Sequence, residues 1–293
     1  MNTTLPDVEL QVISLLKEDR HNGELTHLAL WYEEITTFQR QFRRRHAETS
    51  FDLIVAAMPV EVAGGRLAKG IPILAFDDLT LEWEEVKLLF GKVLRLISKY
   101  SPEREAEACA LYRMLHSGFR LENVCYSWYE YGSSDAITGV SGVGADLVDF
   151  AVHSALHPFL ANHREALISL VDLELWRRKA CPICGGKPDL SLLTTAGTRD
   201  LVCCRCDARW LFQRLECAFC DNNRPDKMAY YVDESGKYRL YVCDACHSYL
   251  KGIDLRGVQS DLLLPLERMR TLDLDRQAQS RNYHPGQARK TLR

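Results

Sequence analysis

The chain has 293 residues, of which 46% are hydrophobic and 26% charged, and its formal net charge is −3. This is the profile of a globular protein long enough for two domains of about 100–200 residues, and its slight acidity gives no chain-wide attraction to nucleic acid or to an anionic membrane. No apolar run reaches the ~20 residues that span a bilayer and no secretory signal opens the sequence, so we expect a cytoplasmic protein without membrane insertion.

The first part of the chain predicts mainly helices. An apolar stripe with alternating spacings of three and four residues indicates a first helix, and its members are Leu28, Trp31, Ile35, Phe38 and Phe42. Further helical patterns cover Thr80–Tyr100, Glu103–His116, Ala145–Leu160 and His163–Arg177. The apolar runs Phe51–Met58 and Pro72–Phe76 fit either buried helix or extended chain, and Gly139–Asp146 indicates a turn. We predict a mainly α-helical domain over residues 1–175.

The second part of the chain predicts short strands. Ala229–Val232 and Tyr238–Val242 flank a loop of five residues, which is the pattern of a β-hairpin, and Trp210–Glu216 alternates in the same way. We predict a small β-rich module over residues 176–262. A C-terminal segment over residues 263–293 would follow, with helical character around Asp261–Gln279 and a frayed basic tail over Asn282–Arg293. The whole chain is then a multidomain α+β protein.

Eight cysteines form the strongest pattern in the sequence. They make four Cys-x-x-Cys pairs, namely Cys181/Cys184, Cys203/Cys206, Cys217/Cys220 and Cys243/Cys246. Eighteen residues separate the first two pairs and twenty-two the last two, whereas only ten lie between the second pair and the third. Two tight turns joined by a hairpin supply the four thiolates of a closed tetrahedral site. We predict two four-cysteine metal sites in tandem, each holding zinc or iron, because such sites accept either metal.

The residue that follows each pair supports this interpretation. These four residues are Gly185, Asp207, Asp221 and His247. A tight metal-binding turn needs a positive φ at this position, which glycine adopts freely and which aspartate and histidine tolerate better than most residues. Cys204 lies inside the second pair and breaks no spacing, so we interpret it as a spare thiol on the opposite face of a strand.

Two further patterns carry less weight. Asp149, His153 and His157 recur at helical spacing, but without the glutamate of a metalloprotease motif they indicate a packed or solvated helix face. Basic residues gather around the first cysteine pairs, at Arg177, Arg178, Lys179, Lys187, Arg199, Arg205, Arg209 and Arg214. They fit a nucleic-acid surface about as well as they fit local compensation of the negative charge on a four-thiolate site.

Three cysteine-containing stretches resemble the signature of formate dehydrogenase accessory proteins of the FdhE type. They are CPICGGKP at Cys181–Pro188, LVCCRCDARWLFQRLECAFCDN at Leu201–Asn222 and VCDACHSYLKGID at Val242–Asp254. TLDLD at Thr271–Asp275, Asn282-Tyr283, Ile71-Pro72-Ile73-Leu74 and Trp176 are also similar to residues of that family. The chain departs from the pattern at Cys204, at Ala218, where proline is usual, and at Asp221, where glycine is usual.

The resemblance implies a mostly helical N-terminal domain followed by two rubredoxin-like knuckles, each with a zinc or iron ion held by the eight cysteines. It also implies a non-enzymatic role in which the chain binds the catalytic subunit of formate dehydrogenase in the cytoplasm during maturation. Trp210, Arg214, Tyr249, Leu250 and Lys251 match the family pattern as packing or partner-contact residues. The residues alone leave two alternatives open, a nucleic-acid-binding zinc ribbon and a rubredoxin-like electron-transfer protein.

Overall fold

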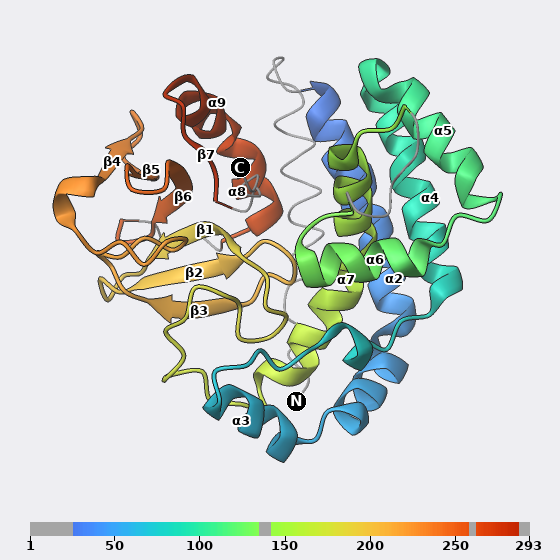
Figure 1. Ribbon diagram of the computed structural model, residues 1–293, viewed down its shortest axis with the longest axis horizontal. Helices are drawn as coiled ribbons and strands as arrows, with labels where there is room; N and C mark the ends of the chain where they lie inside the picture. The colour runs from blue at the N-terminus through green and yellow to red at the C-terminus, as the bar shows by residue number, and fades with distance from the viewer. Residues whose placement is uncertain (1–25, 135–141, 258–261, 287–293) are drawn as a thin grey trace. The chain divides into compact units, whose positions relative to one another are not determined.

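The computed structural model describes residues 26–134, 142–257 and 262–286 of the chain. These residues belong to two compact units, shown by their elements in Figure 1. The first unit comprises Met1–Ile54 and Phe76–Asn162, and the second comprises Val55–Ala75 and His163–Arg293. A helical first part and a β-rich cysteine module in the last third confirm the predicted α+β fold class.

Helices build the first unit. Their bounds are α2 Thr26–Ala57, α4 Trp83–Tyr100, α5 Glu105–Leu115, α6 Leu121–Tyr131 and α7 Ala145–Ile168. Helix α4 packs along α5 (Figure 1) and buries an apolar stripe that includes Val86, Phe90 and Val93. Two members of the stripe predicted for the first helix, Ile35 and Phe42, are likewise buried on α2. The amphipathic spacing of these sequences therefore decides which helix faces form the core.

The helix predicted over His163–Arg177 is wrong in its bounds. Helix α7 runs without interruption from Ala145 to Ile168, with Pro158 inside it. Its buried face continues through Leu160, His163 and Leu167, so no break separates the two predicted segments. Beyond the helix, the Asp172 carboxylate accepts a 2.7 Å hydrogen bond from the Glu174 backbone N–H, a local turn that competes with helix.

Two of the helices in the described ranges were not predicted. Helix α3, Val60–Ala68, contains Gly64 and Gly65, which weaken any helical signal. Helix α6 buries Leu121, Val124 and Trp128 at spacings of three and four, a signal that the sequence does carry. The predicted run Phe51–Met58 belongs to α2 as far as Ala57. In the second run, residues 72–75 are not helical, and a short 3₁₀ turn, η2, follows at Phe76–Asp78.

A seven-stranded sheet forms the centre of the second unit. Its strands are β1 Pro188–Leu193, β2 Arg199–Cys203, β3 Arg209–Phe212, β4 Met228–Val232, β5 Tyr238–Cys243, β6 Ser248–Asp254 and β7 His284–Pro285. The order is β3-β2-β1-β6-β5-β4, with β7 also paired to β6. Strands β1–β3 form one antiparallel half and β4–β6 another. The parallel pairing of β1 with β6 joins the two halves.

Two C-terminal helices pack on this sheet. Helix α8, Leu264–Arg270, places Leu264 against Leu190 and Ile253, and α9, Leu272–Ser280, places Leu274 and Ala278 against Leu240. The single helix predicted over Asp261–Gln279 is therefore broken at Thr271. The Thr271 hydroxyl donates to the carbonyl of Glu267 at 2.8 Å, which satisfies a terminal acceptor of α8.

The predicted frayed tail is wrong at its start. Asn282 has a left-handed backbone, and β7 then pairs with β6 at Ser248 and Tyr249. The remainder of that prediction, residues 287–293, lies outside the described residues, as do residues 139–141 of the predicted turn at Gly139–Asp146. In the described part of that turn, Gly142 has a φ of 91° and α7 begins at Ala145.

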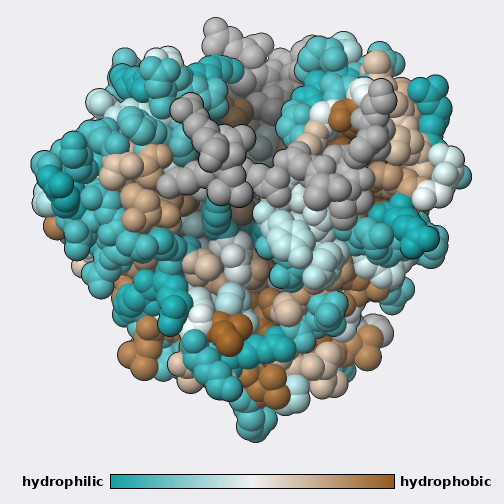
Figure 2. Space-filling view, in the orientation of Figure 1, coloured by the Kyte–Doolittle hydropathy of each residue, from teal (hydrophilic) through white to brown (hydrophobic). Residues whose placement is uncertain are grey.

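Across the described ranges no helix combines the length and the apolar character that a membrane span requires. In the view of Figure 2, hydrophobic residues appear in scattered groups among hydrophilic ones.

Candidate metal centres

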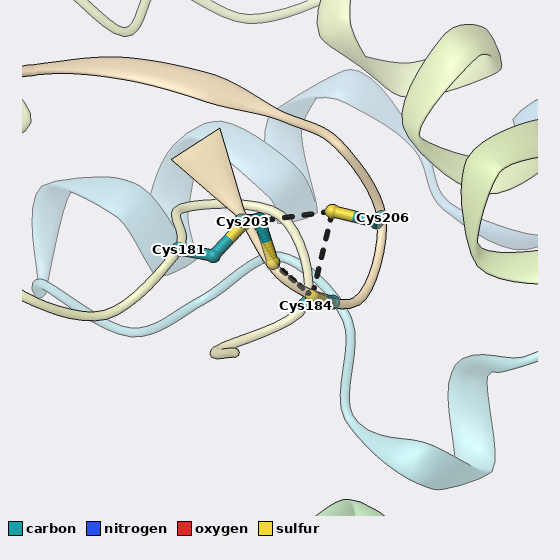
Figure 3. Close-up of side chains that lie close together, drawn as sticks. All are labelled: Cys181, Cys184, Cys203 and Cys206. Atoms are coloured by element: carbon teal, nitrogen blue, oxygen red, sulfur yellow. Dashed lines mark hydrogen bonds between the residues drawn. The ribbon is translucent and has the colours of Figure 1, made fainter. Parts of the chain in front are cut away.

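The eight predicted cysteines come together in two groups of four. Cys181, Cys184, Cys203 and Cys206 form the first group, and Cys217, Cys220, Cys243 and Cys246 the second. Within each group the four sulfur atoms lie within 4.8 Å of one another. Each half of the sheet supplies one group, with its first pair in the loop before the first strand and its second pair at the turn that follows the second strand. Figure 3 shows the side chains of the first group converging.

The separation of the sulfur atoms fits a tetrahedral metal. Neighbouring sulfurs lie 3.5 Å apart for Cys184 and Cys203 and 3.8 Å apart for Cys217 and Cys246. A metal with bonds of about 2.3 Å to sulfur has tetrahedral edges of about 3.8 Å, whereas a disulfide bond is about 2.05 Å long. All eight cysteines are free thiols, and seven of them are buried. The two groups could therefore hold one metal ion each.

The tight turns have the backbone that the sequence predicted. The residues after the four pairs have φ values of 69° at Gly185, 61° at Asp207, 58° at Asp221 and 54° at His247. Three of the turns are closed by the same backbone hydrogen bond, from the first cysteine of the pair to the residue five positions on, as in Cys217 N–H to Asn222 O at 2.8 Å. The four pairs thus repeat one knuckle geometry.

Backbone N–H groups lie close to two of the sulfur atoms, and burial changes the pKa of two of the thiols. The Arg205 N–H points at the sulfur of Cys203 at 3.3 Å, and the Phe219 N–H points at that of Cys217 at 3.4 Å. Burial raises the pKa of the Cys181 and Cys206 thiols well above the ordinary value. Without a cation these two thiols would therefore stay protonated, and metal binding would release their protons.

An extended segment from earlier in the chain supports the first group. The backbone N–H groups of Ile73 and Leu74 donate to the carbonyls of Pro182 and Ile183, both at 2.8 Å. These two carbonyls lie between Cys181 and Cys184, so the segment holds the first knuckle from outside. Residues 72–75 are therefore not part of a buried helix, and Phe76 begins the 3₁₀ turn η2.

The C-terminal segment holds both groups, which sequence reasoning missed. Arg268 of α8 pairs with Asp189 at 2.6 Å and with Asp207 at 2.8 Å, next to the first group. At the second group, the Tyr283 hydroxyl donates to Asp244, and the His284 N–H donates to the carbonyl of His247 at 2.9 Å. These pairs join residues far apart in the sequence, so no local pattern could indicate them.

Most of the other residues singled out in the sequence are packing residues. Trp210, Tyr249, Leu250 and Lys251 are all buried, whereas Arg214 is exposed. Cys204 lies outside both sulfur groups, and its N–H donates to the Lys187 carbonyl at 3.0 Å. His153 and His157 lie in neither group, with ring centroids 6.2 Å apart.

The chain has relatives among known proteins. No family model matches the chain. It is 28% identical over 224 residues to the FdhE homolog of Aquifex aeolicus, a match that covers 74% of this chain and 73% of that protein. It is 29% identical over 192 residues to FdhE of Escherichia coli K12, covering 63% of this chain. The chain is FdhE-like.

The FdhE-like assignment extends to the fold. The crystal structure of FdhE from Pseudomonas aeruginosa superposes with a TM-score of 0.63 at 19% identity and covers 97% of this chain and 95% of that one. At this identity the likeness establishes the fold alone. The match to the E. coli protein spans 58% of its length, less than two thirds.

Proposed function

We propose that this chain is a non-enzymatic accessory factor that binds the catalytic subunit of formate dehydrogenase in the cytoplasm during its maturation. The observation that carries the proposal is the pair of buried four-cysteine groups in an FdhE-like chain. The proposed metal ligands are the eight cysteines of the two groups, and the proposed ions are zinc or iron.

The closed form of both groups supports a structural role for the metals. Four cysteines satisfy all the positions of a tetrahedral ion, so no position is left for water or substrate, unlike a catalytic site with three protein ligands. A bound metal would crosslink the turns of each knuckle and so supply folding free energy to a small module. We accordingly propose residues 176–262 as a metal-stabilised module, with residues 1–175 as the helical domain and 263–293 as the C-terminal segment.

The nucleic-acid alternative has less support. Of the basic residues around the first cysteine pairs, Arg199 is only 4% exposed and Lys179 pairs with Asp221. Phosphate contacts require exposed cations that can neutralise phosphates and displace the counterions condensed on the nucleic acid. No observation favours electron transfer over a structural role, although iron at the same sulfurs would make it chemically feasible.

The experiment is affinity capture of the tagged chain from formate-respiring cells of its own source, with mass spectrometry of the bound proteins. We expect the catalytic subunit of formate dehydrogenase to be recovered with the parent chain and lost with C181S and C243S. C109S is the matched control, since Cys109 is exposed and lies outside both groups, and it should retain the subunit. Absence of the subunit from the parent and control captures would refute the maturation role.

A further inference from the structure

Among the described residues, Arg199 is a buried cation without an acidic partner. It is 4% exposed and lies on β2, where its guanidinium donates through Nη1 to the backbone carbonyls of Gln213, at 3.3 Å, and Glu216, at 2.9 Å. Its Nε has no hydrogen-bond partner, and no described carboxylate lies within ion-pair distance of it. Arg268, the other largely buried arginine near the cysteines, has two aspartates.

Burying an unpaired charge is costly. Moving an isolated ion from water into a protein interior costs several kcal/mol even after relaxation. Two carbonyl oxygens and two aromatic rings offset part of this cost, with the Arg199 guanidinium 5.9 Å from the centroid of Phe212 and 5.1 Å from that of Tyr241. Among the residues that the structure describes, no carboxylate forms an ion pair with Arg199, so the rest of the cost is not offset by direct pairing.

Two of the residues that Arg199 contacts are close in sequence to cysteines of the second group. Glu216, whose carbonyl it holds, directly precedes Cys217, and Tyr241, whose ring it faces, lies two residues before Cys243. Burial lowers the pKa of the Arg199 guanidinium, whereas negative charge on Tyr241, Cys217 and Glu216 acts in the opposite direction. A divalent metal with four thiolates carries two excess negative charges. A charged second centre would therefore add negative charge beside Arg199, in addition to that of the Glu216 carboxylate.

We propose that Arg199 is a positioning residue for the second metal centre. Its cation compensates the excess charge of the tetrathiolate, and its bonds to Gln213 and Glu216 fix the chain that enters the Cys217 knuckle. Arg199 lies on β2, which leads to Cys203 of the first group, and its guanidinium faces Tyr241 of β5, so it also links the two halves of the sheet. This inference rests on the proposed occupancy of the second group by metal.

The test is zinc release from the full chain into an excess of a chelating indicator, with C181S and C243S used to assign the two phases to the two centres. The variants are R199K, which keeps the charge, and R199Q, which keeps only hydrogen bonding. We expect R199Q to speed release from the second centre by about tenfold or more, as loss of groups around a metal site does, and to leave the first unchanged. R199K should restore most of the retention.

The controls separate this inference from the proposed function. R276M removes an exposed cation from α9 and should leave both phases at the parent rate. If R199Q releases zinc from the second centre at the parent rate, or if R199K is no better than R199Q, the charge role of Arg199 is wrong. If the parent binds no zinc at the second group, the metal centre itself is refuted.

Discussion

At one position of the sheet that carries the two cysteine groups, a glycine allows a side chain from a neighbouring strand to pack closely against the backbone. Tyr241 of β5 lies across Gly252 of β6 and reaches towards Ser191 of β1, because glycine has no side chain to block it. A Cβ atom at position 252 would lie 2.4 Å from Cε2 of Tyr241 and 3.1 Å from the Ser191 hydroxyl. The ring that faces Arg199 thus depends on a glycine in a neighbouring strand.

Substitution of this glycine tests the arrangement. We expect G252A to lower the free energy of unfolding by about 1–3 kcal/mol, because the Tyr241 ring must move out of a packed layer. Urea denaturation of the metal-loaded chain measures this. The matched control is G65A in α3, where an added Cβ meets no atom within 4 Å, and there alanine should stabilise the helix by about 0.5–1 kcal/mol. Equal effects of the two substitutions would contradict the account.

The turn residues were the part of the site most accessible from sequence. Positive φ values at Asp207, Asp221 and His247 follow from a local requirement, and the sequence displays that requirement through residue type and spacing. The position of Arg199 could not be predicted in the same way. Its partners lie on β3, on the chain beyond it and on β5, and only the sheet order brings them together.

At the scale of elements, ion pairs attach helix α8 to the strands and turns around the first cysteine group. Arg268 joins Asp189, next to the start of β1, and Asp207, the left-handed residue after Cys206. The side chains of Arg268 and Asp189 are each 17% exposed, so solvent screens the pair only partly. The aspartates raise the pKa of the Arg268 guanidinium, although burial acts in the opposite direction.

Loss of this arginine should be costly. We expect R268M to lower the free energy of unfolding by about 3 kcal/mol, because two largely buried carboxylates lose their counter-ion. R276M is the matched control, since Arg276 pairs with Asp273 on the exposed side of α9, where both side chains are more than 70% exposed, and its loss should cost about 0–1 kcal/mol. Chemical denaturation of both variants decides the matter, and a loss for R268M no larger than that for R276M would argue against the ion network.

Elements with strong local periodicity were predictable, and those with long-range causes were not. The stripe on α4 and the hairpin of β4 and β5 were predicted within a few residues. Strands β1 and β6 were not, because their parallel pairing joins residues about sixty positions apart and leaves no local signature. Helix α3 was hidden by its paired glycines.

At the scale of the whole molecule, the β-rich part contains the same arrangement of strands and cysteine turns twice. Each antiparallel half of the sheet offers four sulfurs from two knuckles, and the halves meet through β1 and β6. Such halves contain few core residues of their own, so metal binding and folding should be coupled. The grouping of the cysteines followed from their spacing, whereas the segments that hold each knuckle from outside, Ile73–Leu74 and the C-terminal helices, appeared only in the structure.

The most direct measurement is the number of metal ions per chain, by elemental mass spectrometry of the purified protein. The account predicts two zinc or iron ions for the parent and for C109S, and one for each of C181S and C243S. Equal metal content in all four proteins, or a parent chain that retains no metal after gel filtration, would contradict the two four-cysteine centres on which the proposed function depends.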